Sequence, residues 1–362
     1  MNEVVAEYDL AERRALAHLP NRALQAFGAV TFASVGYPFR VHDVAELWRY
    51  IDVMHEGRFE RNLALLGKVS EEEIDLAAWL AKGTLEYSNN RFSKAFTGRH
   101  CLTRSLFQLR GIRQLKTERP GMKILELGPG SGYLSLLLAR TGYAVDTVEV
   151  AQAFVLHQRM FFSHFLPRES QVIDQQEKLP FTSLPAAGIR QVPWWIYADN
   201  SRATLDYDLI TANHALAEFH PESLGYLLRR FGENHQSRFG RSPVIVAEWL
   251  GARMRRYEDL LQQCHEHGWT HEFQNPFYFF RYQPEIAKTQ LEMDHHQRRL
   301  ERQPWKTAKS ITDRIEYRRS GSKNRGQSKQ VEDLSLGRLR EVFNNLIPDE
   351  KTPDELFLWD RS

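Results

Sequence analysis

The hydrophobic pattern in the middle of the chain switches between short apolar runs and helical periodicity. Residues 124–127 (ILEL) form an apolar run long enough for one buried strand, and residues 134–142 (LSLLLARTG) are apolar at helical density and end on a glycine. The same order recurs at 143–150 (YAVDTVEV), which alternates like a strand, and at 151–166, which predicts a helix ending before Pro167. Strands and helices in regular succession predict an α/β domain with a doubly wound sheet.

Three later segments continue this pattern. Strands are predicted at 207–212 (YDLITA), 243–251 (PVIVAEWLG) and 277–282 (FYFFRY), and a helix that starts at Pro221 separates the first two. The residues at 275–278 (NPFY) are predicted to form a turn before the last of these strands.

The residues before the α/β pattern are predicted to be mostly helical. Asp43 is placed to cap one helix, and Ser70 with Glu73 forms a capping box for another, which Gly83 is predicted to end. The chain therefore divides into three predicted units. They are a helical N-terminal region at 1–115 that serves as a substrate lid or in oligomerisation, the α/β domain at 116–285, and a charged helical extension at 286–362.

The C-terminal extension differs in composition from the rest of the chain. Residues 320–330 (SGSKNRGQSKQ) have the composition of a flexible linker, and an amphipathic last helix follows that is expected to dock on the body or on a partner. Basic residues outnumber acidic ones between Arg298 and Lys329. Two interpretations stay open for this stretch: a solvated helix face with its linker, or an electrostatic contact with RNA or an acidic carrier.

Composition narrows the class of protein. The 362 residues are 42% hydrophobic, which is ample for a sizeable core, and the net charge of +2 calls for neither nucleic acid nor a membrane surface as partner. The two cysteines, Cys101 and Cys264, exclude a disulfide scaffold and fit a reducing compartment. No signal peptide or apolar run of membrane-spanning length is present, so we expect a cytoplasmic protein without a membrane span.

The glycine-rich loop at 123–133 (KILELGPGSGY) carries the chemistry. Glycines allow a ligand to approach the backbone, and the first turn of the next helix offers unpaired N–H groups. A phosphate-binding P-loop would need Lys and Ser/Thr after its last glycine, where Tyr133 and Leu134 stand. The dinucleotide fingerprint would need glycine in place of Tyr133. The pattern that remains is E-x-G-x-G-x-G.

This loop resembles motif I of the class I S-adenosylmethionine-dependent methyltransferases. The resemblance implies S-adenosylmethionine as the cofactor and a Rossmann-like seven-stranded sheet. Glu149 ends the next predicted strand about 20 residues after Gly128, where such folds place an acid for the ribose, although a solvated strand end is the alternative. The predicted cofactor-binding residues are Glu126, Gly128, Pro129, Gly130, Gly132, Tyr133, Glu149, Val150, Gln152 and Asn213.

The predicted strand at 207–212 is followed by NHALAEFH (213–220). Because ligands bind outside the carboxyl ends of parallel strands, His214 is the best-placed base candidate, with a plain core or capping histidine as the alternative. If a helical turn begins there, Glu218 lies one turn on and orients the imidazole. A metal site of His214, Glu218 and His220 is disfavoured because this is not an established ligand spacing, so we predict no metal.

Candidate acceptor-binding residues lie in three segments. Residues 87–104 are polar and interleaved with aromatics, which indicates either a solvated connection or a substrate lid that contains Arg91. Residues 192–200 (VPWWIYADN) place aromatic rings either against the sheet or against a sugar or base. The third segment is the end of the predicted strand at 243–251, where Glu248 is a second acid near the predicted site. The residues predicted to contact the acceptor are Arg91, Trp194, Trp195, Tyr197 and Glu248.

Four motifs together, ELGPGSGYLS, VEVAQAFVLHQ, PWW and NHALAEF, resemble a bacterial group of sugar O-methyltransferases associated with polysaccharide gene clusters. The resemblance covers roughly residues 85–290 and implies methyl transfer to a hydroxyl of a sugar or a glycan-linked acceptor. Two alternatives stay open, namely a methyltransferase acting on RNA, a nucleotide or a protein, and a non-catalytic scaffold of the same fold. The predicted partners are a small-molecule or glycan acceptor and a second copy of the chain, with nucleic acid less favoured.

Overall fold

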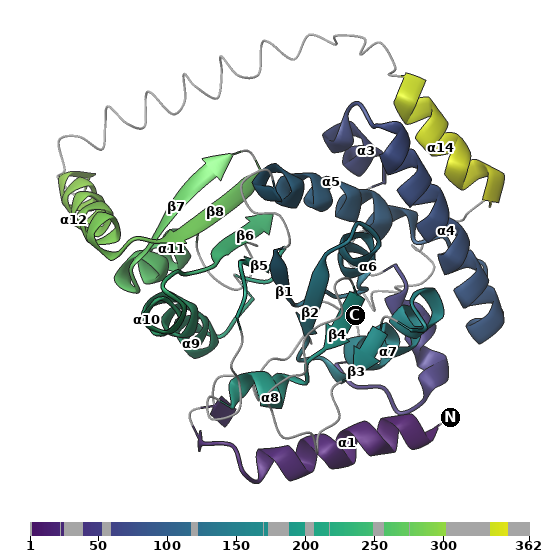
Figure 1. The fold of residues 1–362 in the computed structure, drawn as a ribbon, viewed down its shortest axis with the longest axis horizontal. Coiled ribbons are helices and arrows are strands. Elements are labelled where there is room, and N and C mark those ends of the chain that lie inside the picture. Colours follow the sequence, from purple (N-terminus) through teal and green to yellow (C-terminus); the bar gives the residue numbers. More distant parts are fainter. Residues whose placement is uncertain are drawn as a thin grey trace.

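The structure is a computed structural model, and Figure 1 shows its fold. It describes residues 2–21, 23–24, 39–52, 59–116, 122–168, 170–172, 188–199, 206–216, 218–248, 257–274, 276–301 and 334–346.

One mixed sheet of eight strands forms the centre of the described part of the chain, in the order β3-β4-β2-β1-β5-β6-β8-β7. The strands are β1 (Lys123–Leu127), β2 (Ala144–Val148), β3 (Ser170–Val172), β4 (Gly188–Gln191), β5 (Leu209–Thr211), β6 (Val244–Glu248), β7 (Trp269–Gln274) and β8 (Phe277–Tyr282). Strands β1 to β6 pair in parallel, whereas β8 runs antiparallel to both β6 and β7. The predicted Rossmann-like α/β fold is confirmed, with one strand more than the seven expected because the three-residue β3 extends one edge.

Helices surround the sheet on both faces. They are α1 (Asn2–Leu16), η2 (Val44–Tyr50), α3 (Phe59–Leu66), α4 (Glu71–Phe92), α5 (Arg99–Lys116), α6 (Tyr133–Arg140), α7 (Gln152–Phe165), α8 (Trp194–Ala198), α9 (Pro221–Arg229), η3 (Arg230–Asn234), α10 (His235–Phe239), α11 (Tyr257–Glu266), α12 (Pro284–Glu301) and α14 (Leu334–Leu346). The predicted helix start at Pro221 agrees with α9, and the predicted helix after Glu149 agrees with α7.

The sheet separates two hydrophobic cores. Neighbouring strand residues alternate between them: Ile124 packs with the core under α3 to α6, while Leu125 packs with the core under α8, α9 and α11. Strands that are buried on both faces need apolar residues at every position, as in a parallel sheet covered by helices. The predicted N-terminal helical region therefore shares its core with the sheet.

The N-terminal helices both confirm and correct the sequence analysis. Ser70 and Glu73 form the predicted capping box, with each side chain accepting a hydrogen bond from the other residue's backbone N–H. The prediction that Gly83 ends this helix is wrong, because α4 continues to Phe92. Gly83 instead allows close packing, since a Cβ there would lie 2.2 Å from the ring of Phe165. Residues 87–104 are consequently the end of α4, a short loop and the start of α5, and not one long connection.

The last helix, α14, docks on the body of the protein. Leu339 and Phe343 are buried, Phe343 makes an edge contact with Phe59, and Arg338 pairs with Glu71 on α4. Figure 1 shows α14 lying along α4. The predicted linker at 320–330 lies outside the described residues, as do residues 302–329 of the basic stretch.

Strands β7 and β8 form a hairpin, so a turn precedes 277–282 as predicted, but Phe277 and Tyr278 of the predicted turn belong to β8 and Asn275 lies outside the described residues. In the described part of the chain, none of the helices combines the length and the apolarity that crossing a membrane would require.

Candidate functional site

The glycine-rich loop connects β1 to α6 at the carboxyl edge of the sheet. Gly128, Gly130 and Gly132 all have positive φ, at 65°, 57° and 83°, a backbone conformation that residues with a Cβ rarely adopt. A Cβ on Gly132 would also lie 2.6 Å from the ring of Phe162 on α7. The loop is therefore shaped by its glycines, as the motif predicted.

Glu149 lies directly beside this loop at the end of β2. Its carboxylate accepts hydrogen bonds from the backbone N–H groups of Gly130 (3.4 Å), Val150 (2.8 Å) and Ala151 (3.1 Å). Burial raises the pKa of Glu149 to about 7, although these three hydrogen bonds act in the opposite direction. The loop and the carboxylate thus form one continuous polar surface in the interior.

Two further carboxylates face the same region. Burial raises the pKa of Glu126 on β1 to about 7, and the charge of Glu149 adds to that rise. Burial also raises the pKa of Glu218 to about 7, and the charge of Glu218 in turn raises the pKa of Glu149. Within the described residues no salt bridge joins these three carboxylates to a basic side chain. Such a surface suits a ligand that carries positive charge and hydroxyl donors.

The segment that contains η2 packs on the outside of the glycine loop. The Ser131 hydroxyl donates to the Tyr50 carbonyl at 2.8 Å, and the Gln158 side-chain amide donates to the Gly130 carbonyl at 2.7 Å. Tyr50 also contacts Phe154 edge to face at 5.0 Å. These contacts from η2 and α7 hold the loop in place.

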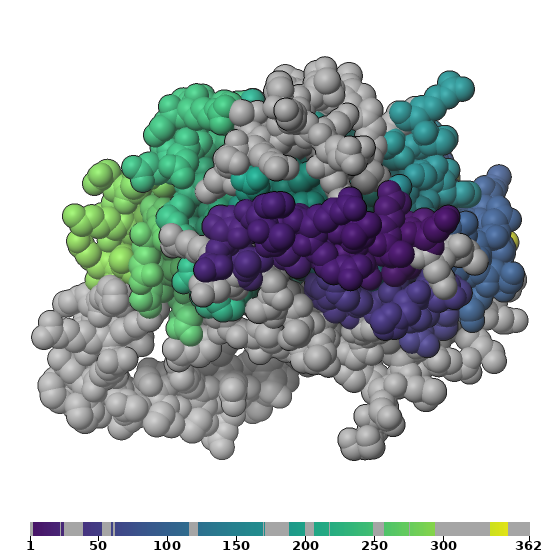
Figure 2. All heavy atoms as spheres, turned by 90° about the horizontal axis from the view of Figure 1, so that it is seen from below, coloured from purple at the N-terminus to yellow at the C-terminus, as the bar shows by residue number. Residues whose placement is uncertain are grey.

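Gln152, predicted to border the cofactor, holds the N-terminal segment. Its side-chain oxygen accepts from the Val41 backbone N–H at 2.9 Å, and its amide nitrogen donates to Asp9 on α1 at 2.9 Å. Arg40 forms ion pairs with Asp9 and Glu12. Helix α1 is therefore attached beside the glycine loop, and Figure 2 shows it lying lengthwise across one face of the molecule.

Tyr8 on α1 is a residue of this region that the sequence analysis missed. Its hydroxyl is buried without a hydrogen-bond partner among the described residues, and burial raises its pKa, with smaller contributions from the charges of Glu12 and Glu149. Only its spacing within an amphipathic helix could have indicated a buried position, because nothing local in the sequence relates it to Glu149.

The predicted acceptor-binding aromatics lie in the core. Trp194, Trp195 and Tyr197 belong to α8, and their exposed fractions are 3%, 5% and 2%. Trp195 contacts Tyr8 edge to face at 5.3 Å, and the Trp194 indole N–H donates to Glu12 at 2.8 Å. Of the two readings left open for this segment, the one in which the rings fill the interior agrees with this burial.

His214 occupies a strained position just after β5. Its φ of 60° is in the left-handed region, which is uncommon for a residue with a side chain and often marks a functional site. Its backbone N–H donates to the Glu248 carbonyl at 3.2 Å. Its Nε2 lies 3.7 Å from Glu248 Oε2 and 3.4 Å from Arg104 Nη2.

The expected support of His214 by Glu218 needs correction. Residues 213–216 form turns and not a helix, so Glu218 does not follow one helical turn after His214. The carboxylate beside the imidazole belongs to Glu248 on β6, which the sequence analysis placed in the acceptor site. Adjacent parallel strands bring these two residues together although they are distant in sequence.

Glu248 is itself held by a buried polar network. Arg104 on α5 pairs with it and donates from Nε at 2.8 Å, and Gln108 donates from its side-chain amide at 2.9 Å. Asn213, predicted to bind the cofactor, accepts from the Glu248 backbone N–H at 2.8 Å and donates to Thr211 at 2.8 Å. Arg104 and Gln108 were missed. Their spacing of four residues puts them on one helical face, but nothing local relates that face to Glu248.

The other predicted residues have varied positions. Tyr133 begins α6 and its buried ring packs on Phe161 at 5.3 Å, while its hydroxyl lies where a Cβ on Gly98 would be. Pro129 and Val150 lie in the loop and next to Glu149. Arg91 lines a separate pocket at the end of α4. No group of histidine, cysteine and acidic side chains that could hold a metal ion occurs in the described ranges.

Comparison with known proteins shows similarity in structure and not in sequence. No protein-family model matches the chain, and no curated protein matches it either. The similar solved structures include methyltransferases. A TehB-like methyltransferase from Corynebacterium glutamicum is 15% identical, with 49% of this chain and 97% of that chain covered and a TM-score of 0.31.

Two further solved structures are of the same kind. A magnesium protoporphyrin IX methyltransferase from Synechocystis with bound S-adenosylhomocysteine is 11% identical, with 54% and 95% of the chains covered and a TM-score of 0.33. A glycopeptide N-methyltransferase in complex with the same compound is 9% identical, with 48% and 86% covered and a TM-score of 0.31. Similarity at this level assigns neither a family nor a substrate.

Proposed function

We propose that the protein is an S-adenosylmethionine-dependent O-methyltransferase that acts on a hydroxyl of a sugar or a glycan-linked acceptor. The observation that supports it best is the contact between the left-handed glycine loop and Glu149. Gly130 N–H meets the carboxylate of Glu149, and both lie at the carboxyl ends of adjacent parallel strands. Ligands of doubly wound sheets bind at this edge.

The residues present fit the proposed cofactor. A carboxylate has about four acceptor positions, and Glu149 uses three for backbone N–H groups, so at least one remains for a ribose hydroxyl. The charges of Glu126 and Glu218 face the same region without a basic partner among the described residues. They would favour the net positive charge of S-adenosylmethionine.

When bound, the cofactor supplies a methyl group that is already activated on a sulfonium. The protein then has to orient the acceptor hydroxyl, exclude water and take up the hydroxyl proton. His214 is assigned that last role, because a sugar hydroxyl is a poor nucleophile at neutral pH. The adjacent Glu248 carboxylate stabilises the imidazolium that forms, and its network with Arg104 orients the ring.

Calorimetry with S-adenosylhomocysteine tests the donor half of the proposal. The wild-type protein should bind it, and Glu149→Ala should weaken the affinity by about tenfold to 100-fold, as expected for hydrogen bonds to a charged group. Glu258→Ala removes an exposed carboxylate on α11 and is the matched control. Wild-type protein that does not bind the compound would favour a non-catalytic scaffold.

Transfer of a labelled methyl group tests the acceptor half. We expect product with nucleotide sugars or oligosaccharides and none with RNA or protein. The basic stretch that motivated the RNA alternative lies mostly outside the described residues. Product with RNA alone, with steep salt dependence, would replace the sugar assignment and leave the donor assignment intact.

A further inference from the structure

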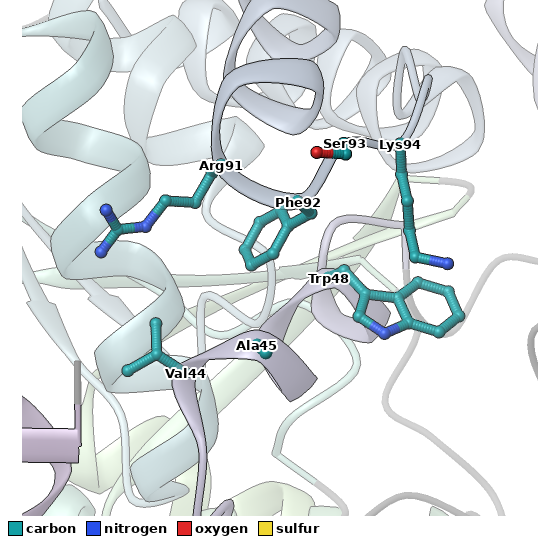
Figure 3. Close-up of a pocket in the computed structure, with 7 residues that line it drawn as sticks. All are labelled: Val44, Ala45, Trp48, Arg91, Phe92, Ser93 and Lys94. Carbon is teal, nitrogen blue, oxygen red and sulfur yellow. The ribbon is translucent and has the colours of Figure 1, made fainter.

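A pocket separate from the glycine loop lies between η2 and the end of α4. It has a volume of about 360 Å³ and is lined by Val44, Ala45, Trp48, Arg91, Phe92, Ser93 and Lys94. Figure 3 shows Arg91 and Lys94 on opposite sides of Phe92, with Lys94 next to the ring of Trp48. One pocket thus combines two cations with two aromatic rings.

The two cations are not neutralised by acidic side chains of the described chain. Arg91 Nη2 contacts the sulfur of Met160 at 3.1 Å, and Lys94 Nζ lies 3.9 Å from the centre of the Trp48 ring. Neither forms a salt bridge with a described carboxylate, in contrast to Arg40, which pairs with Asp9. A third cation, Arg49, lies 5.8 Å from the same tryptophan ring.

Two acidic residues lie in or next to η2, beside this pocket. Asp43 uses its carboxylate to accept from the Ala45 backbone N–H at 2.8 Å, as the N-cap of η2. Glu46 lies on η2 itself, and its charge adds to the rise that burial causes in the pKa of Tyr50. The balance of charge at the pocket is therefore positive, with Arg49, Arg91 and Lys94 against these two acids.

The helix end by itself does not account for this arrangement. Basic residues often lie near a helix C-terminus because that end carries about half a negative charge. The left-handed Ser93 already closes α4 with bonds from Ser93 and Lys94 N–H to Asn89 and Ser88 carbonyls. Two full positive charges exceed the half charge of the helix end, and the dipole gives no reason for a tryptophan-lined hollow between them.

We propose that this pocket binds the phosphate of a phosphorylated sugar acceptor, with Trp48 and Phe92 against the sugar ring. Guanidinium and ammonium groups are the usual partners of phosphate, and aromatic rings suit the apolar faces of sugars. The pocket adjoins the donor loop through η2, because the Tyr50 carbonyl bonded to Ser131 lies two residues, or about 4 Å of 3₁₀ rise, from Trp48. The inference rests on the proposed function for the role of its ligand.

Titration calorimetry with glucose 1-phosphate tests the site, with glucose, inorganic phosphate and glucuronic acid as comparison probes. We expect glucose 1-phosphate to bind more tightly than all three, and Arg91→Gln and Lys94→Gln each to weaken it about tenfold or more. Arg140→Gln is the matched control, because Arg140 also lies over a tryptophan, Trp79, at 5.2 Å but outside the pocket. Equal weakening by the control would overturn the proposal, and so would glucuronic acid binding as tightly as glucose 1-phosphate.

Binding of S-adenosylhomocysteine to the same variants separates this inference from the proposed function. The Arg91 and Lys94 variants should retain wild-type affinity for it, which also shows that they are folded. If that compound binds and glucose 1-phosphate does not, the pocket assignment fails and the donor assignment stands. If only glucose 1-phosphate binds and Arg91→Gln weakens it, the site is real and the methyltransferase proposal fails.

Discussion

The carboxylates at the carboxyl edge of the sheet differ in how their charge is balanced. Glu126, Glu149 and Glu218 have raised pKa values, and burial is the largest cause for each. Glu248 is fully buried as well, but Arg104 and Gln108 bond to it, and His214 lies beside it. Glu126 and Glu149 are buried and Glu218 is half-buried, and none of the three forms a salt bridge within the described residues, whereas Glu248 is paired.

The difference separates a binding surface from a positioning surface. Buried charge without a partner costs free energy, and a cationic ligand recovers that free energy on binding. Paired charge is already compensated, so its value lies in fixing the geometry of its neighbour. We therefore expect changes in the first group to act on cofactor affinity, and changes around Glu248 to act on turnover and folding.

The largest effect is expected from His214→Ala. Loss of a general base should lower kcat about 100-fold to 10,000-fold, while the affinity for S-adenosylhomocysteine stays at the wild-type value. Steady-state kinetics and calorimetry on the same preparation measure both. His220→Ala removes a nearby exposed histidine that caps α9 and should leave kcat unchanged. Unchanged turnover in His214→Ala would remove this residue from the mechanism.

Arg104→Met should have the next largest effect, on stability. It leaves Glu248 buried without its ion-pair partner, which typically costs about 3–5 kcal/mol in the free energy of unfolding. Arg113→Met on the same helix breaks a more exposed pair with Glu72 and should cost about 1 kcal/mol or less. Urea unfolding compares the two variants. Equal losses would mean that the buried pair has no special role.

The smallest effect should appear in the pH dependence of stability. The pKa of Glu126 is raised from 4.5 to about 7 in the folded protein. Its contribution to stability is therefore fully present below about pH 4.5 and is lost as pH rises through about 7, by up to about 3 kcal/mol. Glu126→Gln stays neutral and should lose less stability between pH 5 and pH 8. If both proteins lost the same free energy of unfolding between pH 5 and pH 8, the raised pKa of Glu126 would be contradicted.

Local features were predictable because they depend on neighbouring residues. The spacing of Gly128, Gly130 and Gly132 predicts a loop with unusual dihedrals, and all three have positive φ. The capping box of Ser70 and Glu73 was predictable for the same reason, since both bonds lie within one turn. The end of α4 was not, because Gly83, which suggested a helix end, packs against Phe165 of another helix while α4 continues to Phe92.

By itself the sequence determined the α/β order, the glycine loop and the position of Glu149 beside it. These depend on hydrophobic periodicity and on backbone sterics within a few residues. Only the tertiary structure decided that the carboxylate beside His214 is that of Glu248 and not that of Glu218. It also decided that Arg104, 144 residues away from Glu248, pairs with Glu248. Pairing of distant charges depends on which strands and helices are neighbours, and sequence spacing does not encode that adjacency.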